Sequence, residues 1–235
     1  MTDASETTVI RIATFNARHA ADDGLFRHRA LVETCRGFDA DVLALQELDR
    51  HVIRTWFRDQ PAIVARTLAM QYVAAPAKHL GPGGRQCNAL LARGQLTDVE
   101  VLDLPQPPGL EPRTAIVARL VLPGLELTAA CTHLHHRPRS NAVPQLEMII
   151  DALAARPGPR LIAGDLNLDA EEATPSLRDA GYLPVEVGPT APRVAPREQI
   201  DWIACDAGFE LVHAEVHEPL VSDHLAVVAT LSRAG

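Results

Sequence analysis

The sequence predicts an α/β fold, and three features indicate it. The chain opens with two successive strand–helix patterns, continues through a strand-rich middle, and then returns to a helix followed by a strand. Its 235 residues are 47% hydrophobic and 22% charged, which suits one well-filled core. No long linker interrupts the chain, so we expect residues 1–235 to form a single domain, with residues 1–8 as a disordered tail.

The first half of the chain contains two predicted βα units and then a series of strands. Residues 9–15 form an apolar run of strand length, and an amphipathic helix is expected over about 25–37. Residues 41–47 repeat the strand pattern, and a second helix begins near Pro61, where proline is tolerated. Between about 86 and 133, four β-like runs are separated by Gly and Pro turns, which favours antiparallel pairing.

The second half begins with a helix over about 142–155, whose apolar stripe marks it as a core element. The run "LIAGDLN" at 161–167 predicts a buried strand that ends in polar residues. The Pro-rich segment 183–198 lacks periodicity and is expected to be a stiff loop. Three further strands, near 199–206, 209–216 and 225–231, complete the pattern.

Composition narrows the range of partners and compartments. The net charge of −8 argues against a broad nucleic-acid surface, and the 4% aromatic content leaves little for stacking platforms or a membrane-interface belt. The N-terminus lacks the basic start and apolar core of an export signal, and no apolar run approaches a membrane span. The four cysteines form no C-x-x-C pair. We therefore expect a cytoplasmic monomer, with reduced thiols and no membrane insertion.

Polar side chains stand at or beside the ends of many apolar runs. Each one alone is explained by a turn or a loop start. As a set they include four carboxylates, which would repel one another in a cleft unless a cation held them. Oxygen ligands from Asp, Glu and Asn suit Mg²⁺ or Mn²⁺, which share their shell with substrate phosphates. The set comprises Asn16, Glu47, Asn88, His133, Asp165, Asn167, Asp201, Asp223 and His224.

The order of these motifs resembles that of the endonuclease/exonuclease/phosphatase superfamily, over about residues 10–231. The resemblance rests on "ATFN", "LALQELD", "CNALLAR", "THL", "AGDLN", "IDWI" and "SDH". It implies a four-layer α/β sandwich of the deoxyribonuclease I-like type, with two packed mixed sheets and helices outside. It also implies metal-assisted hydrolysis of a phosphoester. The local runs are most similar to short bacterial members of the superfamily.

The resemblance also implies a role for each residue. Glu47 would be the principal ligand of Mg²⁺ or Mn²⁺, completed by Asn16 and Asp223. Asp165 would orient or deprotonate the attacking water, which Asn167 would steady. Asp201 would fix the tautomer of His224. His133 and Asn88 would donate to the phosphate, and the leaving oxygen would take its proton either from His133 or from a metal-bound water.

Two features of the sequence bear on substrate specificity: a departure from the superfamily's usual residues before Asn88, and a set of loop arginines. Short bacterial members commonly carry Tyr-Gly before the equivalent of Asn88, whereas Gln86 and Cys87 stand here. Several loop arginines fall near the predicted strand ends and would suit a compact anionic substrate. We expect Arg18, Arg85, Arg137 and Arg193 to contact substrate phosphate, whereas Arg54, Arg113, Arg139 and Arg197 are further loop cations.

Several functions remain open from the sequence alone. The first is a phosphodiesterase or phosphatase that acts on a small phosphorylated substrate or short nucleic acid. The second is a nonspecific Mg²⁺-dependent nuclease for DNA or RNA, and the third is a catalytically silent binding module with the same fold. A zinc site at "HLHHRP" fails because Arg137 and Pro138 occupy positions that a zinc hydrolase would fill with Asp and His. We expect His135 and His136 to be solvated rim residues.

Overall fold

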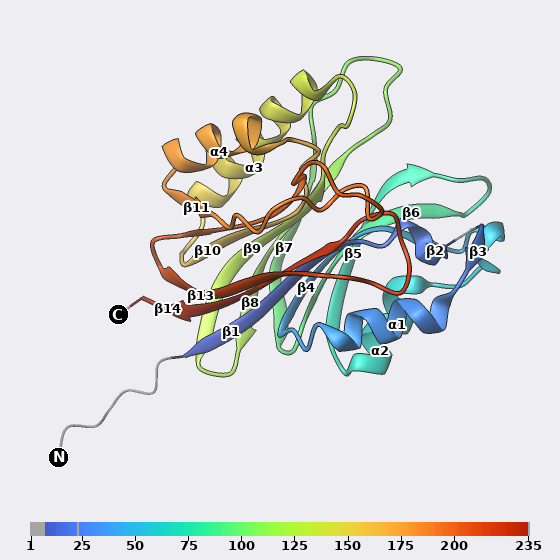
Figure 1. The fold of residues 1–235 in the computed structure, drawn as a ribbon, viewed down its shortest axis with the longest axis horizontal. Helices are drawn as coiled ribbons and strands as arrows, with labels where there is room; N and C mark the ends of the chain where they lie inside the picture. Colours follow the sequence, from blue (N-terminus) through green and yellow to red (C-terminus); the bar gives the residue numbers. More distant parts are fainter. Residues whose placement is uncertain (1–7, 23, 235) are drawn as a thin grey trace.

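The structure, a computed structural model, describes residues 8–22 and 24–234. Two six-stranded mixed sheets pack face to face, and each outer face is covered by two helices (Figure 1). This is the four-layer α/β sandwich that the motifs predicted. The expected tail falls on residues 1–7, which lie outside the described residues, whereas the carbonyl of Thr8 accepts a hydrogen bond from Arg233 N.

The first sheet has the strand order β13-β14-β1-β4-β6-β5. Its strands β1 and β4 are parallel, and its other neighbours are antiparallel. Helices α1 and α2 cover its outer face. The elements are β1 (Val9–Asn16), β4 (Val42–Arg50), β5 (Gln71–His79), β6 (Arg85–Ala92), β13 (Phe209–His217), β14 (Ala226–Arg233), α1 (His28–Gly37) and α2 (Gln60–Leu68).

The second sheet has the order β11-β12-β10-β9-β8-β7, with β9 and β10 parallel. Helices α3 and α4 cover its outer face. The elements are β7 (Gln95–Asp103), β8 (Thr114–Leu122), β9 (Leu125–His133), β10 (Arg160–Asp165), β11 (Tyr182–Pro184), β12 (Asp201–Asp206), α3 (Ala142–Ala154) and α4 (Ala170–Asp179). A small hairpin, β2 (Ala21–Asp22) and β3 (Leu25–Phe26), and the short 3-10 turns η1 (Arg18–Ala20), η2 (Ile53–Thr55) and η3 (Arg139–Asn141) complete the chain.

Three groups of buried apolar residues hold the layers together. The central group lies between the sheets and draws residues such as Ile12, Leu90, Ile116 and Ile203 from both of them. One outer group packs α1 and α2 on the first sheet, and the other packs α3 and α4 on the second. Burial of apolar surface on both faces explains why β1, β4, β9 and β10 are continuous apolar runs rather than alternating ones.

Most predicted strands and helices are present, with five differences. The first helix begins at His28 and not near residue 25, because Leu25 and Phe26 pair with residues 21–22 in a hairpin. Strands β5 and β11 and helix α4 were not predicted, and β11 overlaps the start of the segment expected to be a loop. The run of middle strands also divides, since β6 joins the first sheet whereas β7, β8 and β9 form an antiparallel group in the second.

Within the described residues, no helix combines the length and apolar composition that crossing a membrane requires. All four cysteines, Cys35, Cys87, Cys131 and Cys205, are buried free thiols. Burial raises the pKa of Cys35 and Cys131 to about 12. Free thiols agree with the expectation from their spacing.

Candidate active site

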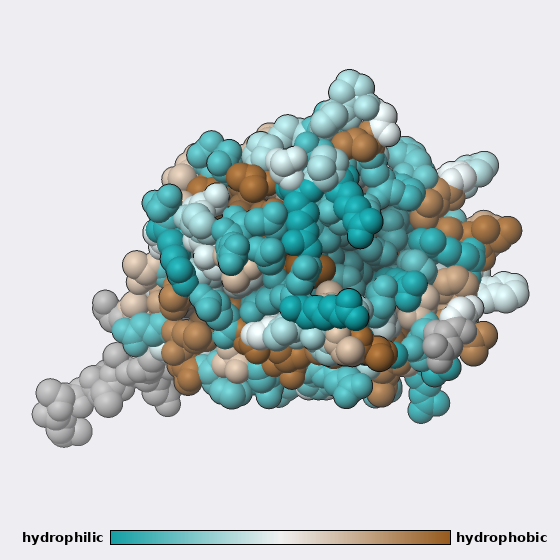
Figure 2. All heavy atoms as spheres, turned by 45° about the horizontal axis from the view of Figure 1, so that its top comes forward, coloured by the Kyte–Doolittle hydropathy of each residue, from teal (hydrophilic) through white to brown (hydrophobic). Residues whose placement is uncertain are grey.

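The carboxyl ends of two parallel strand pairs, one in each sheet, meet at one end of the sandwich. In the first sheet Asn16 of β1 stands beside Gln46 of β4, and in the second Asp165 of β10 stands beside His133 of β9. Asp201, the first residue of β12, is also opposite Asp165. Because the sheets pack face to face, polar strand ends from distant parts of the sequence share one pocket of ≈ 410 Å³ (Figure 2).

Glu47 faces this pocket because β4 contains a β-bulge. Leu45 pairs with Ala89, and Leu48 pairs with Cys87, so β4 carries one extra residue over that interval. Glu47 adopts φ of 56°, a left-handed conformation, between buried neighbours. A bulge of this kind redirects a side chain that strict alternation would otherwise place elsewhere.

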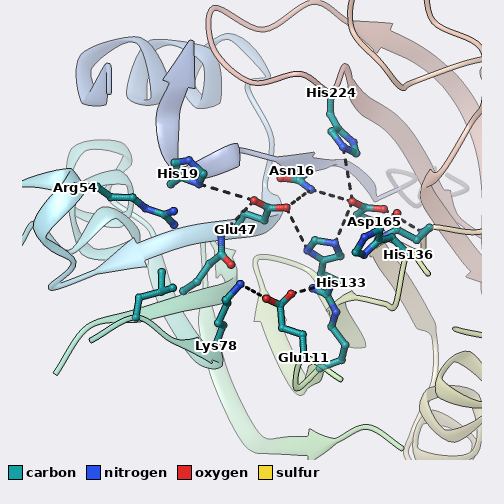
Figure 3. Close-up of a pocket in the computed structure, with 14 residues that line it drawn as sticks. Asn16, His19, Glu47, Arg54, Lys78, Glu111, His133, His136, Asp165 and His224 are labelled. Atoms are coloured by element: carbon teal, nitrogen blue, oxygen red, sulfur yellow. Dashed lines mark hydrogen bonds and ion pairs between the residues drawn. The ribbon is translucent and has the colours of Figure 1, made fainter. Parts of the chain in front are cut away.

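Asn16 connects the two carboxylates (Figure 3). Its Nδ2 donates to Glu47 Oε1 at 3.2 Å and to Asp165 Oδ2 at 2.9 Å. Asn16 is itself held by Ser222, whose hydroxyl donates to its carbonyl at 2.6 Å. Residues from the two sheets therefore meet at a single carboxamide.

No Lys or Arg side chain of the described residues forms an ion pair with Glu47. Among the described residues its ion-pair neighbours are the imidazoles of His19 and His133, each at 3.9 Å. Burial, followed by the charge of Arg54, lowers the pKa of His19 to about 4. Burial, followed by Arg113, lowers the pKa of His133 well below its ordinary value, so both rings are neutral at pH 7. A carboxylate that forms no direct ion pair with Lys or Arg, beside Asn16 and Asp165, fits a hard divalent cation.

Asp165 is buried at the base of the pocket. Its Oδ1 accepts from the backbone N–H of Asn167 at 3.0 Å, and its Oδ2 lies 3.4 Å from His133 Nε2. Burial, followed by the negative charge of Asp201, raises the pKa of Asp165 to about 7. A carboxylate with this pKa can take up a proton near neutral pH.

His224 forms a hydrogen-bonded relay with Asp201. Its Nδ1 lies 2.9 Å from Asp201 Oδ2, which also accepts from Thr190 Oγ1 at 2.7 Å. Burial alone would lower the pKa of His224, but the charge and hydrogen bond of Asp201 outweigh it and raise the pKa to about 10. The ring is therefore an imidazolium whose Nε2 lies 4.0 Å from Asp165 Oδ2.

Ligand atoms of Asp165, Asp201 and His224 all lie within 4.8 Å of one another, a spacing compatible with a metal ion. However, Asp201 Oδ2 already accepts from Thr190 and His224. A protonated imidazole also has no lone pair to offer to a metal. The Glu47 side of the pocket is thus the better cation site.

Three predicted site residues lie outside the pocket lining, and one of them, Asp201, contacts the lining residue His224 as described above. Asp223, expected as a metal ligand, has a half-exposed side chain that pairs with Arg18 at 3.4 Å beside a smaller cavity of ≈ 210 Å³. Asn88, expected to contact phosphate, is buried, and its Nδ2 donates to the carbonyl of Thr114 at 2.9 Å. Asn167 does line the pocket, and its Nδ2 donates to Leu134 O at 3.0 Å.

The four arginines predicted to contact phosphate also lie outside the main pocket. Arg18 pairs with Asp223, and Arg193 pairs with Asp22 at 2.9 Å. Arg85 Nη1 donates to the carbonyl of Gly84 at 3.0 Å. Arg137 lines a separate cavity of ≈ 430 Å³, together with His136, Arg139 and Asn167.

Three other cations line the pocket in their place. Arg54 forms two 2.8 Å hydrogen bonds with buried Asp49, and Lys78 pairs with Glu111. Arg113 lies 3.4 Å from Glu111, is only 7% exposed, and has an Nε with no hydrogen-bond partner among the described residues. A buried guanidinium with an unused donor fits an anionic ligand.

Sequence reasoning missed several of these residues. His19, Lys78 and Glu111 belong to none of the motifs named above, so their positions in the sequence did not mark them as site residues. Only the proximity of His19 to Asn16, three positions earlier, could have indicated its role. Thr190 lies in a Pro-rich loop without periodicity. His135, expected on the rim, is buried, and its Nε2 lies 2.9 Å from the carbonyl of Glu111, so it braces the loop that carries Glu111. His136 is exposed and does lie on the rim.

Solved structures with the same fold include two bacterial proteins and one from a fish. An endonuclease/exonuclease/phosphatase from Beutenbergia cavernae has a TM-score of 0.81 and 22% identity, covering 97% of this chain and 72% of that one. A mannosyl-6-phosphatase from Bacteroides thetaiotaomicron has a TM-score of 0.76 and 15% identity, covering 94% and 99%. D. rerio TDP2, complexed with a single-strand DNA product, has a TM-score of 0.74 and 18% identity, covering 95% and 99%.

These likenesses establish the fold. No curated protein matches the sequence. The family model of the Endonuclease/Exonuclease/phosphatase family matches residues 13–224, a span that includes every strand-end residue described above. The chain therefore belongs to the endonuclease/exonuclease/phosphatase family.

Proposed function

We propose that this protein hydrolyses phosphoester bonds with the help of Mg²⁺ or Mn²⁺. The observation that carries the proposal is the convergence of Glu47, Asn16 and Asp165 in a pocket where no Lys or Arg of the described residues forms an ion pair with Glu47. The substrate would be a small phosphorylated molecule or a short nucleic acid. Four buried free thiols further support a cytoplasmic location.

Glu47 and Asn16 would hold the metal ion. When bound, the ion would polarise a phosphate oxygen and so stabilise the charge that develops on it. Asn16 Nδ2 donates to both carboxylates and its Oδ1 accepts from Arg18 N at 3.1 Å, so Oδ1 is the atom that Asn16 would offer to a cation. Asp223, which lies with Arg18 at the neighbouring cavity, would act on this site through charge and not through contact.

Asp165 would act as the general base. The Asn167 N–H fixes its Oδ1, and its pKa of about 7 allows it to accept the proton of the attacking water. His224, held as an imidazolium by Asp201, would donate from Nε2 to a non-bridging phosphate oxygen. Arg113 and Lys78 would bind further phosphate oxygens from the other side of the pocket.

The proposal is tested by assaying a generic phosphodiester and a panel of phosphomonoesters, with and without a chelator. We expect activity to disappear with the chelator and to return with Mg²⁺ or Mn²⁺. Asp165→Asn should lower turnover by several orders of magnitude. Glu147→Gln, on the exposed side of α3, is the matched control and should retain full activity. Turnover that survives complete removal of metal would contradict the mechanism.

A further inference from the structure

An exposed apolar tip stands beside the pocket. We call residues 51–58 the Trp56 loop; it follows β4 directly and contains the turn η2. Ile53, Trp56 and Phe57 are 75%, 79% and 61% exposed. Isolated exposed apolar side chains are ordinary, but three within five residues are unusual. Two of the three are aromatic, in a chain whose aromatic content is only 4%. The other tryptophan, Trp202, is completely buried.

The backbone holds these side chains outward. Phe57 N donates to Val52 O at 2.9 Å, Trp56 N to Ile53 O at 3.0 Å, and His51 N to Arg58 O at 3.1 Å. Trp56 and Phe57 both have φ of 56°, a left-handed conformation that bulky side chains rarely adopt. Such conformations persist where the surroundings enforce them, and they cluster at ligand-binding sites. The exposure of Trp56 and Phe57 is therefore built into a fixed loop.

The same loop also forms part of the pocket wall. Arg54 lines the pocket (Figure 3) and comes from the middle of the loop. Two hydrogen bonds to buried Asp49 anchor its guanidinium. The Cα atoms of Arg54 and Trp56 are two residues apart, so they lie no more than about 7 Å from each other. A ligand that fills the pocket and extends past Arg54 would therefore come close to the Trp56 loop.

We propose that Trp56 and Phe57 form a stacking platform for a base of single-stranded nucleic acid whose phosphate occupies the pocket. This rests on the proposed function and specifies its substrate class. An aromatic face next to a phosphate site matches the two parts of a nucleotide. Arg58, exposed in the same loop, forms no ion pair with a described residue and can contact a neighbouring phosphate. The net charge of −8 disfavours the broad contact that a duplex or an anionic bilayer would need.

The two tryptophans provide a direct test. Exposed Trp56 should respond to a ligand, whereas buried Trp202 should give a constant background. We expect a single-stranded oligothymidylate, added in chelator so that no hydrolysis occurs, to quench tryptophan fluorescence and to protect it from acrylamide. Trp56→Ala should weaken binding of a labelled oligonucleotide by about 5- to 150-fold, measured by anisotropy. Trp56→Phe should retain most of the affinity.

The control variant is Val212→Ala, which removes a comparably exposed apolar side chain from β13 and should bind normally. Equal oligonucleotide affinity in Trp56→Ala and in the unsubstituted protein would overturn the proposal. Quenching by brominated phospholipid vesicles without any response to the oligonucleotide would also overturn it, in favour of a membrane contact. Because binding is measured without turnover, failure of hydrolysis would overturn the proposed function and leave the stacking result standing.

Discussion

Thr190 controls the orientation of His224 without touching the pocket. Its hydroxyl donates to Asp201 Oδ2 at 2.7 Å and accepts from the backbone N–H groups of Ile200 and Asp201, both at 3.2 Å. Asp201 in turn holds His224 Nδ1. The buried Oδ1 of Asp201 has no hydrogen-bond partner among the described residues, so the carboxylate depends on its Oδ2 contacts. Thr190 is therefore a positioning residue that acts through Asp201.

Replacement of Thr190 tests this relay. Thr190→Val removes the donor and should lower kcat by about 10- to 100-fold while KM changes little. The buried partner groups lose a hydrogen bond, so the free energy of unfolding should fall by about 1–3 kcal/mol. Thr190→Ser, which keeps the hydroxyl, should restore most of the kcat. If Thr190→Val loses stability but keeps its kcat, Thr190 has only a structural role.

His224 should make stability depend on pH. Its pKa is about 10 in the folded protein and about 6.5 when unfolded, so the folded state holds its proton more tightly. This contribution to the free energy of unfolding is fully present below about pH 6.5 and disappears as pH rises to about 10. The difference in stability between the unsubstituted protein and His224→Gln, measured by urea denaturation, should shrink across that range. A constant difference would show that His224 is not an imidazolium in the folded state.

At the scale of elements, Glu47 depends on the bulge in β4. The apolar run at 41–47 predicted the strand, but it could not predict the extra residue, which depends on pairing with β6. The first helix was predicted three residues too early, because residues 25–26 pair with residues 21–22 and strands of two residues are too short to show a periodic pattern. Short pairings of this kind are decided by their partners and not by their own sequence.

Helix α4 could have been predicted from the capping residues at its N-terminus. Asp169 caps the helix by accepting from the N–H groups of Glu171 and Glu172, and the Glu172 side chain accepts from the N–H of Asp169. This capping box is visible in the sequence as Asp followed three residues later by Glu. Pro175 lies inside the helix, where a proline removes one backbone N–H donor.

The cap formed by Asp169 should contribute measurably to stability. Asp169→Ala should lower the free energy of unfolding by about 0.5–2 kcal/mol, because two N–H groups lose their acceptor. Chemical denaturation would measure the loss. Glu171→Ala is the control, since this exposed side chain makes no capping contact, and it should change stability little. An unchanged midpoint in Asp169→Ala would show that the cap contributes nothing.

At the scale of the whole molecule, the two sheets share one central core and one pocket. Neither sheet can bury the inner faces of Ile12 or Ile116 without the other. We therefore expect the described residues to behave as a single domain with one cooperative unfolding transition. Far-ultraviolet circular dichroism and fluorescence of buried Trp202 should give the same midpoint. Two separate midpoints would show that the sheets unfold independently.

The sequence by itself determined the fold class, most of the strands along the chain, and the residue types available to the site. Apolar runs and the polar residues at their ends are local features, which adjacent residues reveal. Because the order of these motifs resembles that of a known superfamily, the sequence also predicted the four-layer sandwich. Asn16, Glu47, His133, Asp165, Asn167 and His224 accordingly line one pocket, with Asp201 beside them.

Only the tertiary structure decided which charges face the pocket. Arg18 and Arg193 are drawn to Asp223 and Asp22, whereas Arg113 and Lys78 reach the pocket beside Glu111. A long side chain in a loop points toward the partners that its neighbours offer, and those partners come from distant parts of the sequence. Spacing along the chain therefore gives the position of an arginine but not the direction of its guanidinium.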